Sequence, residues 1–242
     1  MSGEMCREDE YYLECEKKWV FLTLMGVAGF YGAFTYSIRG GVFCNAQTAN
    51  FVLFAMALGN MDWRGALYYV IPMSAYLLGA IVSEAVPRPV KRTGILRWDT
   101  LLILIEMLAV IMLGLLPEEA PYQISQVTIN FICSMQYNTF RQAQGVPMAT
   151  TFCTNHLRQT GIAIVKSIRQ GGDKEQEDKM KGHIKMLGVF VLGGIIATVL
   201  CRFFMGKAIW ATLIPLMILF TNLLYADRKK EHDQILQTPR GH

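Results

Sequence analysis

Long apolar stretches without a charged residue recur through this chain of 242 residues. The first extends from Trp19 to Ile38, and the most C-terminal one extends from Ala208 to Ala226. A helix needs about 20 apolar residues to cross the hydrocarbon core of a bilayer, and inside that core only helices and closed barrels satisfy their own backbone. Hydrophobic residues make up 52% of the chain and charged residues only 17%, which is too apolar for an ordinary soluble domain. The sequence therefore predicts an all-α, polytopic membrane helix bundle.

Two segments interrupt this pattern with glycine and polar residues. Residues 39–50 read RGGVFCNAQTAN, and residues 141–155 read RQAQGVPMATTFCTN. Both contain an arginine, then Gly-Val, then a cluster of Thr and Asn that opens a helix-like run, which indicates an internally duplicated chain. We expect Asn45 to cap one short helix, and Pro147 to stand at the start of the other, over residues 148–168. The first, at about 14 residues and roughly 21 Å, is suited to a half-helix rather than a full crossing.

The distribution of charge decides how often the chain is expected to cross the membrane. Cytoplasmic loops of membrane proteins carry an excess of Lys and Arg. If both short helices crossed, one basic segment would lie outside, whereas the acidic turn at Glu118 and Glu119 suits the outer side. We therefore expect about six transmembrane helices plus two half-helices that return to their own side, with both termini cytoplasmic. The basic segments are Lys17–Lys18, residues 87–97, residues 166–185 and Arg228–Lys230.

Six crossings place three in each half of the chain. Because three is an odd number, the second half is predicted to be inserted upside down relative to the first, as two inverted repeats. The connection from Gly59 to Gly65 must be extended in this arrangement. The expected organisation is a cytoplasmic N-terminal tail at 1–18, a first membrane repeat at 19–117, a second membrane repeat at 118–226 and a cytoplasmic C-terminal tail at 227–242.

Two stretches resemble the signature regions of a known family. Phe30–Gly59 contains GGVFCNAQTANFVLFAMALG, and Ser134–Leu157 reads SMQYNTFRQAQGVPMATTFCTNHL. Both are similar, in order and spacing, to signature regions of the YoaK-like family of multi-pass membrane proteins of unknown function, and the resemblance covers about residues 19–226. It implies about six spans and no established activity. The family often has an acidic residue near Gly32 and Ser/Thr-Gly-Asn where this chain has Thr48-Ala49-Asn50.

Polar residues in the interrupted segments and in neighbouring spans are candidates for lining a solute path. Polar groups at membrane depth either line such a path or bond helices to one another, and both interpretations stay open. The two arginines either attract an anionic solute together with the positive ends of the half-helices or anchor span ends at the interface. Glu106 is either a proton or cation site or one partner of an interhelical hydrogen bond. The path candidates are Arg39, Asn45, Gln47, Thr48, Asn50, Glu106, Gln136, Asn138, Arg141, Thr150, Thr151 and Thr154.

The function that these patterns favour is a small transporter or channel for a polar or anionic small solute. The alternative is a membrane-embedded scaffold or interaction protein without transport activity. No Ser-His-Asp, H-E-x-x-H, P-loop or dinucleotide pattern occurs, so we expect no enzyme and no catalytic residue. The six cysteines form no C-x-x-C pair, so no metal and no cofactor is expected.

The expected partners are the lipid bilayer, the solute and a second copy of the chain. Gly26, Gly29 and Gly32 fall on one face of the first span, and such a face allows helices to approach closely, which favours a homodimer. Basic residues form no stripe with interleaved aromatic residues, so no nucleic acid partner is expected. The predicted localisation is the cell membrane, as a multi-pass protein.

Overall fold

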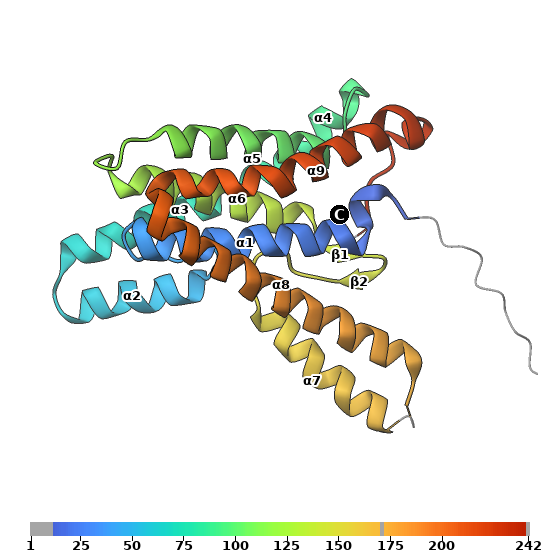
Figure 1. Ribbon diagram of the computed structural model, residues 1–242, viewed down its shortest axis with the longest axis horizontal. Coiled ribbons are helices and arrows are strands. Elements are labelled where there is room, and N and C mark those ends of the chain that lie inside the picture. Colours follow the sequence, from blue (N-terminus) through green and yellow to red (C-terminus); the bar gives the residue numbers. More distant parts are fainter. Residues whose placement is uncertain (1–11, 170–171, 241–242) are drawn as a thin grey trace, which may run out of the picture.

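The computed structural model describes residues 12–169 and 172–240 (Figure 1). Most of these residues are helical, and the predicted all-α bundle with helices that can span a membrane is confirmed. The acidic residues 1–11 of the predicted N-terminal tail lie outside the described residues. The elements are η1 (Glu14–Glu16), α1 (Lys18–Ile38), α2 (Gln47–Gly59), α3 (Trp63–Ala85), α4 (Pro87–Thr93), α5 (Trp98–Leu115), α6 (Tyr122–Thr139), β1 (Gln142–Ala143), β2 (Val146–Pro147), α7 (Thr154–Arg169), α8 (Lys174–Phe204), η2 (Met205–Thr212), α9 (Leu213–Tyr225), η3 (Ala226–Lys230) and η4 (His232–Gln234).

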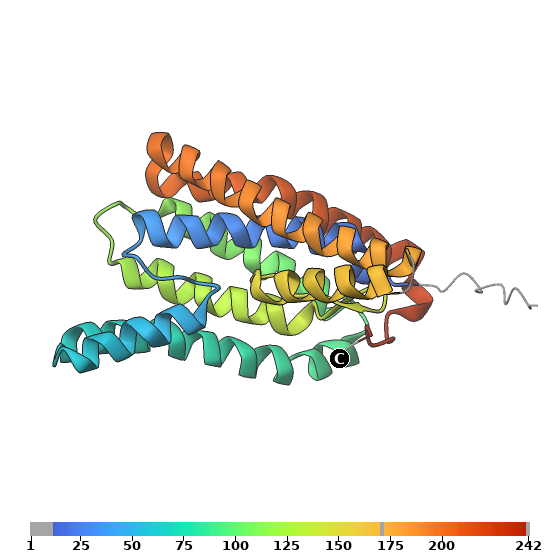
Figure 2. The same ribbon diagram turned by 90° about the horizontal axis from the view of Figure 1, so that it is seen from below.

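The long helices lie side by side along one axis of the molecule (Figures 1 and 2). In Figure 1, α1, α5 and α8 run from right to left, and α3, α6 and α9 run back. One end of the bundle therefore carries the start of α1, helix α4, the α7–α8 connection and the C-terminal segment, and we call it the terminal end. The opposite end carries the α2–α3 turn, the α5–α6 loop and the α8–η2 junction.

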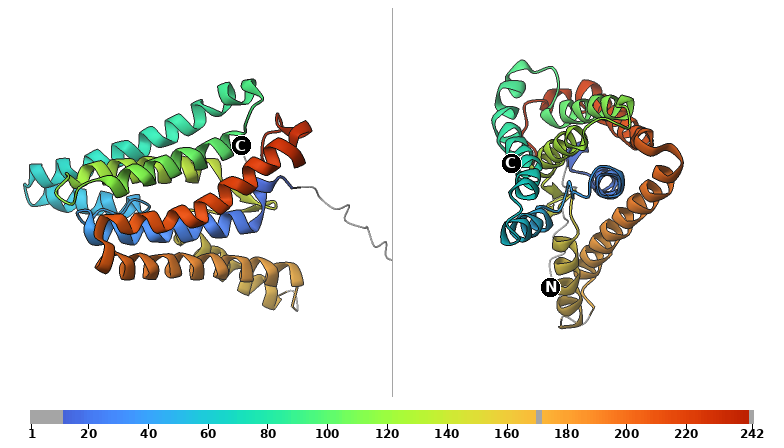
Figure 3. Two further views of the ribbon diagram at one scale, coloured as in Figure 1. Left: turned by 45° about the horizontal axis from the view of Figure 1, so that its top comes forward. Right: turned by 90° about the vertical axis from the view of Figure 1, so that its left-hand side faces the viewer.

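Helix α1 occupies the centre of the bundle, with other helices around it in the end-on view (Figure 3). Its side chains Phe21, Leu24, Met25 and Phe34 are fully buried. It packs along α8 and also contacts α6, η2 and α9. Because lipid tails are as apolar as these side chains, such contacts stabilise a membrane bundle through close packing rather than through the hydrophobic effect.

Four stretches of the described residues are long and apolar enough to cross a membrane: Lys18–Ile38, Trp63–Thr93, Trp98–Leu115 and Lys174–Lys230. The last stretch holds both α8 and α9, which run in opposite directions. Helix α6 is not among the four, because Gln, Ser, Thr and Asn side chains lower its mean hydropathy. Its polar residues are largely buried against other helices, which is typical of a polar span that avoids lipid.

The two short helices each begin near the middle of the long axis (Figures 1 and 2). Helix α2 has 13 residues and ends at the opposite end of the bundle, whereas α7 has 16 residues and ends at the terminal end. The turn between α2 and α3 is tight, with Met61 in the left-handed region at φ 57°. The extended connection expected between Gly59 and Gly65 is therefore wrong, because α3 already begins at Trp63.

The starts of both short helices also differ from expectation. Asn45 does not cap α2, since Ala46 is the N-cap residue and the Asn45 side chain instead donates to the Ala28 carbonyl of α1 at 3.0 Å. Pro147 does not open a helix either. It lies in β2 of a two-stranded hairpin that turns at Gly145, and α7 begins only at Thr154.

The glycine face of α1 packs inside the chain. A Cβ atom on Gly29 would lie 2.1 Å from the Phe190 carbonyl oxygen of α8, and one on Gly32 would lie 3.0 Å from Asn45 Nδ2. Gly26 likewise faces Val189 of α8. Gly26 and Gly29 let α1 and α8 approach closely, and Gly32 makes room for Asn45, so the face from which a homodimer was inferred is already used within one chain. Dimerisation itself stays a prediction.

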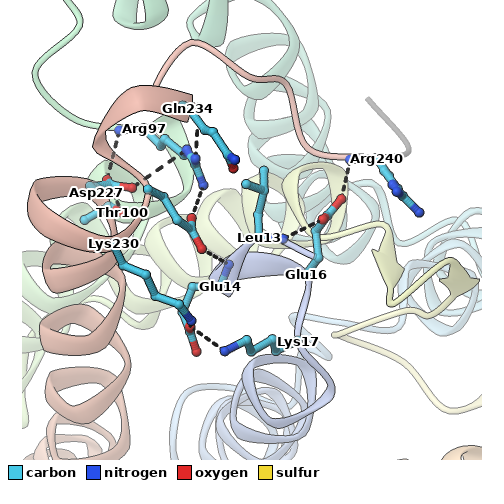
Figure 4. A network of polar contacts seen from close by, with 11 residues as sticks. Leu13, Glu14, Glu16, Lys17, Arg97, Thr100, Asp227, Lys230, Gln234 and Arg240 are labelled. Atoms are coloured by element: carbon cyan, nitrogen blue, oxygen red, sulfur yellow. Dashed lines mark hydrogen bonds and ion pairs between the residues drawn. The ribbon is translucent and has the colours of Figure 1, made fainter. Parts of the chain in front are cut away.

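A buried polar network joins three chain segments at the terminal end (Figure 4). Arg97, just before α5, donates from Nη1 to Glu231 Oε2 at 2.6 Å, and its Nε lies 3.8 Å from Asp227 Oδ1. The backbone N–H of Glu14 donates to Glu231 Oε1 at 2.8 Å. We call these four residues the terminal clasp. It connects the N-terminal segment, the start of α5 and the C-terminal segment.

Electrostatics around the terminal clasp favours the charged forms of Arg97 and Glu14. Burial alone would lower the pKa of Arg97, but Cys15, Glu231 and Asp227 beside it raise that pKa above its ordinary value. Burial would raise the pKa of Glu14, but hydrogen bonds from Lys17, Trp19 and Lys230 hold it below its ordinary value. Glu14 therefore contributes stability above its ordinary pKa, and that contribution is lost as the pH falls through its lowered folded-state pKa.

Candidate functional site

In the first loop–helix segment (residues 39–59), the side chains of Asn45, Gln47 and Asn50 are hydrogen-bonded within the chain, whereas Nε and Nη2 of Arg39 have no hydrogen-bond partner among the described residues. Asn50 Nδ2 donates to the Phe43 carbonyl at 2.7 Å, and Asn50 Oδ1 accepts the Phe43 N–H at 3.3 Å. Gln47 Nε2 donates to Asn130 Oδ1 of α6 at 2.7 Å. Together with the Asn45 bond to α1, these contacts fold the loop onto its neighbours. Thr48, by contrast, is exposed.

Helix α6 carries a polar stripe, of which the sequence-based candidates include only Asn138. Gln126, Asn130, Ser134 and Asn138 follow one another at intervals of four residues, so they share one face of the helix. Gln126 bonds the Arg39 carbonyl at 2.7 Å, Asn130 bonds Gln47, and Asn138 donates to Ser83 Oγ of α3 at 2.9 Å. The signal that identifies this stripe is the four-residue spacing of amide and hydroxyl side chains in an otherwise apolar helix.

The second loop–helix segment (residues 141–169) is less well satisfied. Gln136 Nε2 donates to the Thr150 carbonyl at 3.2 Å, but Gln136 Oε1, Ser134 Oγ and Thr150 Oγ1 have no hydrogen-bond partner. All three side chains are at most 1% exposed, and Thr151 beside them is also fully buried. Buried polar atoms without partners cost about 1–3 kcal/mol each, so such a cluster marks a place where a polar ligand or water gains hydrogen bonds.

A cavity of about 260 Å³ adjoins this cluster, between the C-terminal turn of α6 and the start of α7. Asn138, Arg141 and Asn155 supply its polar wall, and Ala149 and Phe152, which flank Thr150 and Thr151, supply much of the apolar wall. A space with an apolar body and a few convergent polar groups is the usual form of a small-molecule site. We call it the α6–α7 cavity.

Arg141 brings a positive charge to the α6–α7 cavity. Its Nε donates to the Asn138 carbonyl at 2.6 Å and its Nη2 to Asn138 Oδ1 at 2.7 Å. Nη2 also lies 3.0 Å from Glu84 Oε2, but the Glu84 side chain is 69% exposed, so water screens that ion pair. The guanidinium is thus held in place at the wall of the cavity, and the side chain is 33% exposed.

Arg39 lies elsewhere and has different partners. It is 1% exposed, its Nη1 lies 3.4 Å from Glu118 Oε2, and Glu118 Oε1 accepts the Gly206 N–H at 2.7 Å. This contact joins the end of α1, the α5–α6 loop and the α8–η2 junction at the opposite end of the bundle. The structure therefore does not bring Arg39 and Arg141 together at one site.

Glu106 is buried in the centre of the bundle. Its Oε1 accepts a hydrogen bond from the Tyr31 hydroxyl of α1 at 2.9 Å, and its Oε2 has no partner. The interhelical bond considered from the sequence is present, and one oxygen remains for a further proton or ligand. Glu106 belongs to α5 and does not line the α6–α7 cavity. Thr154, the first residue of α7, is exposed and does not line it either.

The backbone around the α6–α7 cavity is fixed by a pair of histidines. His156 Nε2 lies 2.7 Å from the Ala149 carbonyl, and its Nδ1 lies 2.9 Å from Nδ1 of His183 in α8. Both side chains are buried. This pair ties the loop before α7 to α8. Within residues 12–169 and 172–240, no group of three His, Cys, Asp or Glu residues is arranged to hold a metal ion.

Comparison with known proteins gives one match. A family model described as "Protein of unknown function (DUF1275)" matches residues 20–221, which is most of the chain and includes both loop–helix segments. No curated protein and no solved structure matches the sequence.

Proposed function

The chain belongs to the DUF1275 family of proteins of unknown function, whose description leaves the activity open, and we propose that it is a small membrane transporter or channel for a polar or anionic solute. One observation carries this proposal. The second loop–helix segment leaves the polar atoms of Ser134, Gln136 and Thr150 buried and unpaired, next to a cavity of about 260 Å³ that Arg141 borders. Asn138 and Asn155 in the wall of the cavity can hydrogen-bond a polar solute, and the arginine favours a negative charge on it.

The arrangement of the helices supports a path through the bilayer. Six long helices alternate in direction, and each short helix starts near mid-depth and returns to one end. In this proposal α1, α2, α3 and α5 form the first repeat and α6, α7, α8 and α9 form the second, inserted upside down. The proposed boundary between the repeats is the α5–α6 loop, at residues 117–118. The proposed role is binding and passage of a solute, not catalysis.

The topology is tested by cysteine labelling. The proposal places the terminal end, with its basic α4 loop, in the cytoplasm, and the acidic α5–α6 loop outside the cell membrane. Glu119→Cys should therefore react with a membrane-impermeant maleimide in intact cells, and Arg92→Cys only after permeabilisation. Both positions are exposed. Glu119 is preferable to Glu118, because Glu118 pairs with Arg39.

The background for this labelling needs few changes. Cys15, Cys44, Cys133 and Cys201 are buried and can remain, whereas the half-buried Cys153 is replaced by Ser. Cys6, which lies outside the described residues, is replaced as well. Reaction of both introduced cysteines from outside intact cells would contradict the proposed topology.

Solute passage is tested by flux into proteoliposomes, with a panel of small anionic and neutral polar solutes. Arg141→Gln removes a charge-assisted contact worth about 1.5–3 kcal/mol, so uptake of anionic solutes at low concentration should fall about tenfold or more while neutral solutes change little. Arg202→Gln is the matched control, because Arg202 is an exposed arginine of α8 that does not line the cavity. Ala149→Leu should block uptake of both classes by filling the α6–α7 cavity.

A membrane-embedded scaffold is the second candidate function. The observation that favours it is the first loop–helix segment, where Asn45, Gln47 and Asn50 are all bonded within the chain. If Arg141→Gln and Ala149→Leu reduce flux only in proportion to a loss of folded protein, or if no solute of the panel is taken up, the transport proposal fails and the scaffold function is favoured.

A further inference from the structure

An apolar groove of about 570 Å³ lies between α1, α8 and the η2–α9 segment. At its floor α1 and α8 nearly touch, because a Cβ atom on Gly193 would lie 2.0 Å from the Gly26 carbonyl oxygen. Leu22, Phe30 and Leu200 line it on either side of this crossing. The groove is separate from the α6–α7 cavity, since the two share no lining residue.

The polar groups of the groove are already satisfied. Its two hydroxyl-bearing residues are Thr23 and Thr212. Thr23 Oγ1 donates to the Trp19 carbonyl at 3.0 Å, and Thr212 Oγ1 donates to the Ile209 carbonyl at 2.7 Å, so each hydroxyl is bonded to its own helix. The groove therefore offers no unpaired donor to a polar ligand, and its surface suits a hydrocarbon chain.

The groove lies on a surface of the bundle that is expected to face lipid. All three of its walls belong to stretches long and apolar enough to cross a membrane, Lys18–Ile38 and Lys174–Lys230. Figure 3, in the end-on view, shows α8 and α9 beside α1 at the periphery of the bundle. The rim residues Leu192, Ile196 and Ile214 are exposed. Lipid chains thus have direct access from the side.

Positive charge flanks the groove at both ends, with Lys207 four positions before the lining residue Ala211 at one end and two lysines at the other. Lys18 precedes the lining residue Leu22 by four positions, and Lys185 precedes the lining residue Val189 by four, so each lies one turn further along the same helix face. Both lysines are exposed. Since α1 and α8 run in the same direction and helical side chains lean toward the N-terminus, both ammonium groups lie toward the terminal end.

We propose that this groove binds an anionic phospholipid, with one acyl chain between α1, α8 and α9 and the phosphate against Lys18 and Lys185. A lipid chain gains no hydrophobic energy by leaving the bilayer for an equally apolar groove. Preference for this lipid therefore comes from the charge of its headgroup, at about 1 kcal/mol for each lysine near the surface. The inference goes beyond solute transport and does not depend on it.

The test uses the full chain in a mild detergent, titrated with dioleoyl phosphatidylglycerol or dioleoyl phosphatidylcholine and examined by native mass spectrometry. The wild type should bind the anionic lipid about tenfold more tightly than the zwitterionic one. Lys185→Glu should abolish this preference, whereas Lys166→Glu, at an exposed lysine of α7 that lines neither the groove nor the cavity beside Lys18, should retain it. Ala211→Phe, which fills the groove, should lower the occupancy of both lipids.

Two controls separate lipid binding from folding and from dimerisation. Each variant is used only if its thermal unfolding temperature matches that of the wild type. Ala55→Phe, on the exposed face of α2, is the matched control for Ala211→Phe because it introduces the same side chain outside the groove. Equal affinity of the wild type for both lipids would overturn the proposal. A lipid-free dimer that Ala211→Phe converts to monomer would overturn it too, because the groove would then hold a second copy of the chain.

Discussion

Arg97→Ala is expected to lower the free energy of unfolding by about 3–5 kcal/mol, because it leaves two buried carboxylates without their cation. Asp227 and Glu231 are at most 2% exposed, and both lie against the Arg97 guanidinium. Asp227 Oδ2 also accepts bonds from the Arg97 N–H at 3.0 Å and the Thr100 hydroxyl at 2.7 Å, and these bonds survive the substitution. These neutral hydrogen-bond donors do not neutralise the negative charge of Asp227. The three segments joined by the terminal clasp should separate together.

The measurement is unfolding of the full chain in mixed micelles by increasing fractions of denaturing detergent. Arg92→Ala is the control, since Arg92 is an exposed arginine of the neighbouring helix α4 and should change stability by less than about 0.5 kcal/mol. The double variant Arg97→Met with Glu231→Met should recover part of the loss, because it removes one of the two uncompensated charges. A loss below about 1 kcal/mol for Arg97→Ala would show that the clasp is solvated and weak.

Gly29→Leu is expected to destabilise the bundle by about 3 kcal/mol or more, since even its Cβ atom meets the backbone of α8. That atom would lie 2.1 Å from the Phe190 carbonyl oxygen and 2.8 Å from the Phe190 carbonyl carbon. Overpacking against a side chain is relieved by a new rotamer, but a clash with backbone forces the two helices apart. The contact between α1 and α8 would then be lost along much of its length.

Thermal unfolding of the purified chain checks this result at several protein concentrations. Gly188→Leu is the matched control, because a Cβ atom at this position of α8 meets nothing within 4 Å. The loss for Gly29→Leu should be the same at every concentration, whereas a loss that shrinks as protein is added would mean that the glycine face joins two chains. Equal stability of the two leucine variants would contradict the α1–α8 packing.

The sequence was sufficient for the coarse fold, because charge-free apolar runs and the spacing of turns determine where long helices lie. It was insufficient where a contact with another part of the chain overrode the preference of a residue for the start of a helix. Asn45 has the side chain of a helix cap, but a carbonyl of α1 binds it instead. Pro147 fits the first turn of a helix, but its hairpin is closed by a bond from Met148 N–H to the Arg141 carbonyl at 3.0 Å.

The candidate site was predictable only in part. Of the residues predicted around the second Arg-Gly-Val segment, Asn138 and Arg141 line the α6–α7 cavity, whereas Gln136, Thr150 and Thr151 are buried and do not line it. Sequence symmetry could not reveal that the amide side chains of the first loop–helix segment are hydrogen-bonded, whereas the buried hydroxyl of Thr150 in the second has no partner in the described part of the chain. That difference depends on which side chains of α6 face each segment, and such contacts are set by helix rotation in the bundle.

Helix α8 is one unbroken rod of 31 residues, about 46 Å long. Near its start it is tied to α7 through the histidine pair, and just beyond its end the Gly206 N–H is held by Glu118, the partner of Arg39. A straight helix without an internal proline transmits displacement instead of absorbing it. A shift of α7 is therefore expected to reach the opposite end of the bundle through α8, where Glu118 and Arg39 lie.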